Sequence, residues 1–372
     1  MPRRLLFAVA VSAALPAQNV LHYKFDEHCG AEVVNFAGST TGNAAIHTVL
    51  PGGPDAARIV GRFDQALSGT AGTGTTTYLT TGWAPATATG SFSFAMWIRN
   101  HPGNPSAIGF GYLFGAQGGN FRVFTGSSGK LFLSGVPGSA TSAANLTTLL
   151  NAGWVHAACT VDGTTNQATW YIDGVADPTV TMTQGVALAG TDFAIGARDT
   201  GGSSASPLDT DEFLFAETLW TPAEVLALSQ NPPAADGGFT SGVPSQCGAG
   251  NVVLGSAGGK PFAGNPSYAL TVATATPSLF LLLVGLDRCT FGGAVPLPLD
   301  GTPLLPLLNG CWIVTDAPVI LNGVAAGAPV TLPLAIPGTV PNSVAIYTQA
   351  LGLDLATGAS SMSNGFASSV GS

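Results

Sequence analysis

The stretch WVHAACTVDGTTNQATWYIDG, residues 154–174, carries the strongest structural signal in this chain. Its first half alternates, with Val155, Ala157, Cys159 and Val161 on one side and Trp154, His156, Ala158 and Thr160 on the other. Such a period of two predicts a half-buried strand. Residues 163–166 form a turn cluster, and Ala168–Ile172 is a second β-rich run closed by Asp173-Gly174, a dipeptide typical of tight hairpins. The stretch therefore predicts antiparallel strands with no helix between them.

A second stretch has the same period. From Ser91 to Arg99, Phe92, Phe94, Met96 and Ile98 are predicted to face inward, with Ser93, Ala95, Trp97 and Arg99 outward. Burying an aromatic or large aliphatic side chain contributes about 1.5–3 kcal/mol, so this face predicts a second sheet packed on the first. Residues 38–57 show little period and are predicted to be a surface loop.

These two stretches resemble the laminin G-like, concanavalin A-like jelly-roll domains. The resemblance rests on the pattern W-x-H-x-A followed by W-Y-x-D-G, and on four further segments in the family's order: Leu21–Glu27, Gly61–Leu67, Ser91–Ile98 and Asp211–Glu224. It covers roughly residues 20–230 and implies an all-β sandwich. It does not fix a function, because this fold hosts lectins, adhesion modules, glycosidases and spacers.

The end of the resemblance has its own local signal. Thr221-Pro222-Ala223-Glu224 has the pattern of a capping box, with Thr221 as the N-cap and Glu224 able to bond back to it. The sequence therefore predicts one short helix that closes the first domain before the prolines at 232–233.

Composition suggests four segments. Arg3, Arg4 and the apolar run 5–14 predict a secretory signal peptide over residues 1–17, and no other segment approaches the length needed to span a bilayer. The jelly roll is expected over 18–231 and a Pro- and Gly-rich linker over 232–247. From 248 to 372 the chain lacks Glu and His, and short apolar runs bounded by Pro and Gly predict a second, smaller β-sandwich.

Charge limits the partners. Only 8% of residues are charged, and 11 Lys and Arg against 20 Asp and Glu give a net charge of −9. Nucleic acids and anionic membranes are attracted by basic patches, so this balance argues against both as partners.

The chain has five cysteines, and export permits disulfides. Cys289 and Cys311 flank one loop-rich segment and are the preferred pair, with Cys29–Cys159 as a weaker alternative. No spacing typical of a zinc site occurs.

Motifs for catalysis are missing from the sequence. Glycosidases on this fold use E-x-D-x-x-E or E-x-D-x-E, yet none of the five Glu residues has an Asp two positions later. The pentapeptide G-x-S-x-G is absent, and residues 254–261 fail the phosphate-loop pattern. Asp209 and Asp211 share one strand face and are the remaining atypical carboxylate pair.

One cofactor is suggested by strand order. The first and last strands of such jelly rolls are neighbours, which would bring Asp26 and Glu27 near Asp211 and Glu212. Oxygen ligands suit calcium, so these four residues are a candidate calcium site; the alternative is that they are carboxylates in water or bonded to backbone amides.

The sequence thus predicts a secreted or envelope-associated, non-catalytic binding or adhesion protein that recognises carbohydrate or an extracellular protein. Trp83, Trp97, Tyr78 and Tyr112 are the candidate ligand-binding aromatics. The alternatives are a glycoside hydrolase with atypical carboxylates and a structural component of an extracellular assembly.

Overall fold

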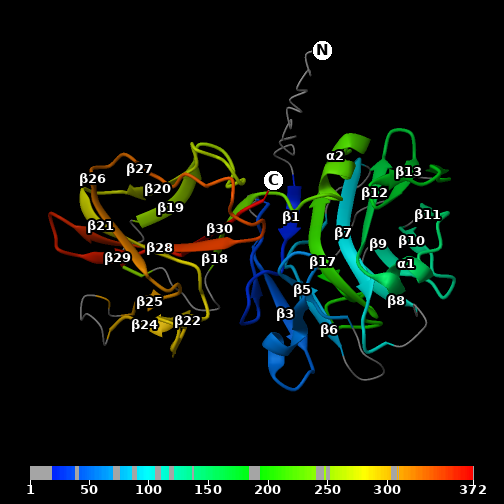
Figure 1. Cartoon of the computed structure of the whole chain (residues 1–372), viewed down its shortest axis with the longest axis horizontal. Helices are drawn as coiled ribbons and strands as arrows, with labels where there is room; N and C mark the ends of the chain where they lie inside the picture. The colour runs from blue at the N-terminus through cyan, green and yellow to red at the C-terminus, as the bar shows by residue number, and fades with distance from the viewer. Residues whose placement is uncertain are drawn as a thin grey trace, which may run out of the picture.

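The computed structural model describes residues 19–37, 42–69, 76–85, 90–104, 110–116, 121–135, 138–183, 193–239, 247–248, 252–302, 308 and 310–371. The predicted signal peptide, residues 1–17, lies outside this range. The chain forms two β-rich lobes side by side (Figure 1). In the described part of the chain no helix has the length and apolar character needed to cross a membrane.

Within the described residues, the N-terminal lobe consists of two antiparallel sheets. The nine-stranded sheet contains β1 (Asn19–Tyr23), β4 (Arg58–Val60), β5 (Gln65–Leu67), β7 (Phe92–Asn100), β12 (Val155–Asp162), β13 (Gln167–Ile172), β14 (Val175–Ala176), β15 (Val180–Thr181) and β17 (Leu208–Ala216). The eight-stranded sheet contains β2 (Glu32–Val33), β3 (Ala44–Thr48), β6 (Thr77–Thr80), β8 (Gly111–Ala116), β9 (Phe121–Thr125), β10 (Leu131–Ser134), β11 (Ser139–Thr141) and β16 (Ala194–Ile195). Three short helices accompany them: η1 (Gly53–Ala57), α1 (Thr147–Ala152) and α2 (Pro222–Leu228).

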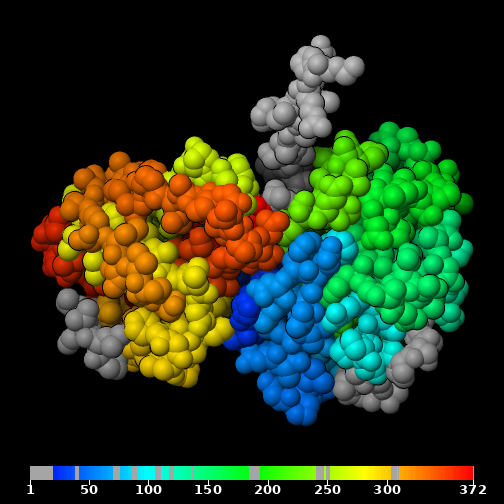
Figure 2. All heavy atoms as spheres, in the orientation of Figure 1, coloured from blue at the N-terminus to red at the C-terminus, as the bar shows by residue number. Residues whose placement is uncertain are grey.

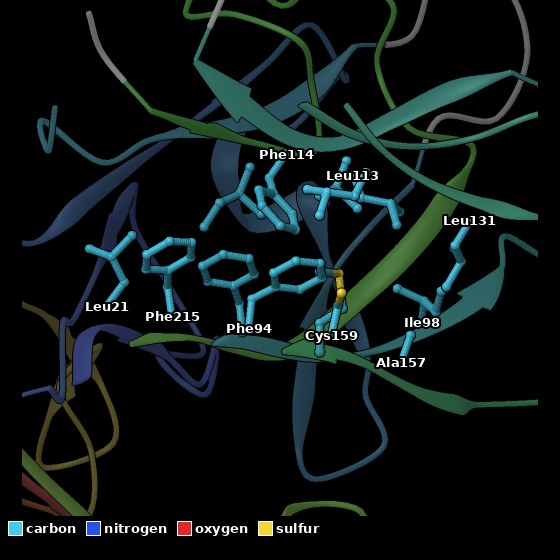
Figure 3. Close-up of a cluster of buried hydrophobic side chains, with 14 of the residues drawn as sticks. Leu21, Phe94, Ile98, Leu113, Phe114, Leu131, Ala157, Cys159 and Phe215 are labelled. Carbon is cyan, nitrogen blue, oxygen red and sulfur yellow. The ribbon is translucent and has the colours of Figure 1, made fainter. Parts of the chain in front are cut away.

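The alternating residues of β7 and β12 form one wall of the core, as predicted. Phe92, Phe94, Met96 and Ile98 are all buried, together with Val155, Ala157, Cys159 and Val161. Figure 3 shows how Phe94 and Phe215 of the nine-stranded sheet meet Leu113 and Phe114 of the other sheet. The ring of Phe94 lies 4.8 Å from that of Phe114, edge to face. Aromatic packing of this kind holds the two sheets together.

The predicted hairpin and turn are confirmed. Ala157–Asp162 of β12 pairs in antiparallel register with Gln167–Ile172 of β13. Asp173 and Gly174 have φ angles of 50° and 78°, the left-handed backbone that a primed turn requires between β13 and β14. Part of the segment predicted as a surface loop, 38–57, is a strand instead: Ala44–Thr48 is β3 and pairs with β6.

The C-terminal lobe is a second sandwich, confirming the predicted fold class. Its six-stranded sheet contains β18 (Ala235–Phe239), β21 (Ser278–Gly285), β26 (Val319–Ala325), β28 (Ala345–Asp354), β29 (Ser360–Met362) and β30 (Gly365–Ser369), counted over described residues. The facing sheet contains β19 (Val252–Ala257), β20 (Ala269–Thr274) and β27 (Val330–Pro333). Two small ribbons, β22 (Thr290–Phe291) with β23 (Val295–Pro296) and β24 (Leu299–Asp300) with β25 (Trp312–Ile313), complete it.

The stretch predicted as a linker, 232–247, is partly strand. Ala235–Phe239 is β18, which pairs with β30 and contributes to the second lobe. The Pro- and Gly-rich composition of this stretch predicts a linker, whereas Ala235 and Phe239 are buried in the structure. The domain limits 18–231 and 248–372 stay a prediction.

A continuous contact joins the two lobes. Val34 and Phe36 of the first lobe share a buried cluster with Phe239, Val314 and Tyr347 of the second. Around this cluster the guanidinium of Arg288 donates to Glu32 at 3.0 Å. Figure 2 shows the dark-blue N-terminal segment lying directly against yellow atoms of the second lobe.

The disulfides differ from the predicted pair. Cys289 and Cys311 are not bonded to each other: Cys29 pairs with Cys289, with Cα atoms 5.8 Å apart, and Cys247 pairs with Cys311, at 5.1 Å. The physical reason is that the lobe contact places Cys29 beside Cys289, while Cys247 reaches the second sandwich through a β-bridge to Met362. All five cysteines are described, and the remaining one, Cys159, is a buried free thiol, so the alternative pair Cys29–Cys159 is also wrong.

We expect the double variant Cys29→Ser/Cys289→Ser to unfold with a free energy about 2–4 kcal/mol lower than the wild type, because this bridge closes a long loop in the unfolded chain. Urea unfolding without reductant measures the difference. Thiol titration of the denatured protein provides the control: we expect one reactive thiol before reduction and five after it. Three or more thiols before reduction would contradict the pairing.

Candidate functional site

The outer face of the nine-stranded sheet is covered. Ala95, Ala158 and Leu214 pack under Val225 and Leu228 of helix α2. The helix begins at the predicted capping box: the Glu224 amide donates to the Thr221 hydroxyl, and Glu224 accepts from the Thr221 amide at 2.7 Å. Of the residues predicted to face outward from β7, Ser93, Ala95 and Trp97 are therefore buried, whereas Arg99 stays partly exposed. The part of this face under α2 is closed to a ligand.

The outer face of the eight-stranded sheet carries a cluster of aromatic rings. Phe110, Tyr112, Phe124 and Phe132 come from β8, β9, β10 and the residue before β8, and we call them the aromatic face. Neighbouring ring centroids lie 5.1–5.4 Å apart, and Phe124 stacks on Phe132 with an angle of 6° between the rings. Phe110 is 53% exposed, so the cluster reaches solvent.

Strand alternation places these rings outside. In β9, Phe121 and Val123 are buried in the core, which turns Phe124 to the other side. In β10, Leu131 and Leu133 do the same for Phe132. A register irregularity between Tyr112 and Phe114 puts Leu113 and Phe114 together in the core, so that Tyr112 faces out. The sheet geometry therefore fixes all of these positions.

Polar groups border the aromatic face. Arg122 donates to the Tyr112 hydroxyl at 3.5 Å, and the Arg198 guanidinium lies 6.0 Å from the Tyr112 ring centroid. Beyond Arg198, the Tyr78 hydroxyl donates to the carbonyl of Thr200, and the Tyr78 ring stacks on His47 at 5.0 Å. The outer face of this sheet thus combines flat rings with donors, the pairing that ligand sites use.

The structure brings two of the four predicted ligand aromatics to this face and separates the other two. Tyr112 and Tyr78 lie on the outer side of the eight-stranded sheet. Trp83 packs against Phe193 and Phe215 of the core. Trp97 is 5% exposed on the opposite sheet, beneath Arg62.

Sequence reasoning missed Phe110, Phe124 and Phe132. For two of them the signal was present in the alternation of FRVFT and LFLS, where Phe124 and Phe132 occupy outward positions between buried core residues. An aromatic side chain on the outer side of a strand indicates either that another element covers that face or that the face binds a ligand. The structure distinguishes these cases, because α2 covers the other sheet.

Three of the four predicted carboxylates, Asp26, Asp211 and Glu212, interact electrostatically beside the β1–β17 pairing. Lys24, completely buried, holds Glu212 at 2.9 Å, and His22 contacts the same carboxylate at 3.1 Å. Arg58 holds Glu27 at 3.1 Å. Two of the four predicted calcium ligands are therefore already paired with cations of the protein.

The other two carboxylates are held by backbone amides. Asp211 accepts from the amides of Arg62 and Phe63 at 2.7 and 3.0 Å, and Asp26 accepts from Gln65 at 3.3 Å. Burial raises the pKa of both carboxyls, and the charge of Glu212 raises them further. The pKa of Glu212 is lowered, because Lys24 and His22 together outweigh its burial. Among described residues, no group of three or more His, Cys, Asp and Glu is arranged to hold a metal ion.

These side chains fit internal ion pairing better than calcium coordination, and calcium binding stays a prediction. A thermal titration decides between them, because a ligand of the native state alone raises Tm. We expect the same Tm in calcium and in EDTA, because Glu212 is already paired with Lys24, and Glu27 with Arg58. A calcium-dependent rise that is lost in Asp26→Asn would show a metal site here.

The pair Asp209 and Asp211 is also engaged. Both are completely buried, and Asp209 accepts from Arg99 at 2.8 Å and contacts His101 at 2.7 Å. A polar recess of about 540 Å³ lies at this end of β7, lined by Arg99, His101 and Asn151 among others. His156 is buried beside Trp97, and burial lowers its pKa to about 3, so it stays neutral in the folded protein.

We expect Lys24→Met to lower the free energy of unfolding by about 3–5 kcal/mol, because it leaves the Glu212 carboxylate buried beside too little positive charge. The matched control is Lys260→Met in the second lobe, whose side chain is 55% exposed and lies 3.7 Å from Asp236; there we expect a change of about 1 kcal/mol or less. Urea unfolding of both variants measures the contrast. Equal losses would contradict the role of Lys24.

Two packed antiparallel sheets with one face covered and one face open define the N-terminal lobe as a lectin-like β-sandwich. Residues 73–226 match the model of the concanavalin A-like lectin/glucanases superfamily, which confirms the predicted resemblance. A search of curated proteins gives no match.

Solved structures similar to the chain share low sequence identity with it. Domain 4 of an extracellular GH43 arabinanase from Geobacillus stearothermophilus, in complex with arabinotriose, is 18% identical, covers 57% of this chain and 98% of its own, and gives a TM-score of 0.40. The receptor-binding domain of botulinum neurotoxin D is 9% identical, with 93% and 88% covered and a TM-score of 0.42. A SAP-like pentraxin from Limulus polyphemus is 17% identical, with 44% and 80% covered and a TM-score of 0.33. At these TM-scores no ligand is transferred to this chain.

Proposed function

We propose that the protein is a secreted, non-catalytic carbohydrate-binding protein whose ligand lies on the aromatic face. The observation that carries the proposal is the set of rings on the open side of the sandwich, where Phe110 is exposed, Phe124 and Phe132 are partly buried, and Tyr112 is buried beneath them at 5% exposed. Exposed aromatic clusters are uncommon on soluble domains and mark binding surfaces.

Carbohydrate suits this surface in two ways. The C–H side of a pyranose ring is apolar and flat, so it stacks on aromatic rings at little entropic cost. Its hydroxyls need donors and acceptors at the margin, and Arg122 and the Tyr112 hydroxyl lie there beside the rings. Export agrees with the two disulfides, because such bonds persist in oxidising compartments.

We expect Phe110→Ala and Phe124→Ala to weaken binding to a polysaccharide about ten- to hundredfold each, since each loses the burial of one aromatic ring, worth about 1.5–3 kcal/mol. A glycan array followed by titration calorimetry on the best ligand measures this. The matched control is Val253→Ala, 58% exposed in the second lobe, which we expect to bind as the wild type does.

A reducing-sugar assay on the bound polysaccharide accompanies the titration. Binding without turnover supports the proposal. Turnover would favour a hydrolase, and binding unaffected by both phenylalanine variants would place the site elsewhere. If no glycan binds, carbohydrate recognition by this lobe is wrong.

A further inference from the structure

The six-stranded sheet of the second lobe has an open edge at β26. The strand order is β18-β30-β28-β21-β26, so β26 pairs with β21 on one side, and within the described residues no strand pairs with its other side. An edge strand directs the N–H and C=O groups of alternate residues away from its sheet. The backbone of β26 can therefore pair with a further strand.

The side chains of β26 are exposed as well as its backbone. Val319, Ile320, Leu321 and Val324 are 38–57% exposed, and we call them the edge strip. Opposite residues of two antiparallel strands point to the same side of the sheet. Leu321 lies opposite Leu282 of the core and so points inward, whereas Ile320 and Val324 point outward. Both sides of the strand thus have apolar surface that a neighbouring strand would bury.

Several other edges of the protein carry features that prevent strand pairing. The strands that end the two sheets of the first lobe, β2, β4, β11 and β14, have two or three residues each, whereas β26 has seven. In the facing sheet, β27 ends in Pro333, which has no N–H, and β19 exposes Val253 alone. Strand β26 is long, exposes four aliphatic side chains, and contains no Asp, Glu, Lys, Arg or Pro.

The opposite end of the same sheet is closed by the first lobe. Asn43 donates to the carbonyl of Gly238 in β18 at 2.9 Å, and Phe239 lies in the buried cluster that it shares with Val34 and Phe36. Pairing through β26 leaves this contact in place. A chain that associates through β26 therefore forms a closed pair of molecules and not a growing fibre.

The lack of charge on this edge indicates the kind of partner that fits it. The net charge of −9 disfavours contact between two copies of the chain through most surfaces, but β26 contributes no charge. A charged peptide finds no opposite charge on this strand, whereas a neutral strand such as β26 itself meets it without repulsion. We propose that two copies of the chain associate by antiparallel pairing of β26 with β26 about a two-fold axis, which joins their six-stranded sheets into one.

One register brings side chains of like kind together. With Asn322 on the axis, the Asn322 side chains of the two copies lie opposite each other, and Ile320 of each copy lies opposite Val324 of the other. Apolar residues then meet apolar residues, and the two amides supply donors and acceptors for each other. Leu321 lies opposite Gly323, which leaves room for the leucine side chain.

This pairing leaves both first lobes accessible. In Figure 1, β26 lies at the end of the second lobe, whereas β8–β11 lie at the opposite end of the molecule. The dimer therefore presents the aromatic face twice, and a polymer that reaches both copies is held more tightly than by one. The association itself does not depend on which ligand the aromatic face takes.

Light scattering on a sizing column, with the full chain over a range of micromolar concentrations, tests the association. We expect the mass of two chains at the highest concentration. In Asn322→Lys two like charges oppose each other at the axis, so we expect the dimer to weaken about tenfold or more. The matched control is Val253→Lys, which places the same charge on an exposed residue of β19 and should leave the dimer intact. An unchanged Tm shows that both variants fold.

Two further variants test the register. Mixing Asn322→Lys with Asn322→Asp should restore the dimer, because opposite charges then meet at the axis. In Asn322→Cys the two thiols lie opposite each other, and Cα atoms in such pairs are about 4.5–5.5 Å apart, within the range of a disulfide. We expect a cross-linked dimer on a non-reducing gel, and none from Val253→Cys.

A wild-type chain with the mass of one molecule at every concentration would overturn the proposal. A dimer that persists in Asn322→Lys, or that cross-links equally through Val253→Cys, would place the contact elsewhere and overturn it as well. A monomer that floats with phosphatidylcholine vesicles would assign the edge strip to a lipid surface instead.

Discussion

The packing of two aromatic sheet faces is the constraint on which the rest of the N-terminal lobe depends. Phe92 stacks on Phe215, Phe94 meets Phe114 edge to face, and Phe121 and Phe193 fill the space between them. Because alternate residues of a strand point to opposite sides, fixing these rings in the core also fixes what each sheet shows to its surroundings. On the nine-stranded sheet that other side receives α2. On the eight-stranded sheet it becomes the aromatic face.

Local patterns in the sequence predict the local structure well. The hairpin at residues 154–174, the inward residues of β7 and the capping box of α2 follow from spacing alone and are confirmed. Position in space was harder to predict. Trp97 and Tyr112 are both aromatic residues in strands, and both are only 5% exposed. Trp97 is covered by Arg62 and Phe63, which come from a segment far away in the sequence, and Tyr112 by the neighbouring rings of Phe110 and Phe124.

The cysteines show the same limit. A pair such as Cys289 and Cys311 is chosen from sequence by proximity along the chain, whereas the real partners are set by the contact between lobes. That contact is built from Val34, Phe36, Phe239 and Tyr347, none of which has a distinctive local pattern. Similarly, strand order predicts that Asp26 lies near Asp211 and Glu212, but no spacing rule reveals that Lys24 is buried against Glu212 and Arg58 against Glu27.

The bridge between Cys29 and Cys289 connects positions 260 residues apart. Because this disulfide joins the two lobes, a protease that cuts the backbone between them leaves both pieces covalently attached. The two halves would remain one particle and would separate only under reducing conditions.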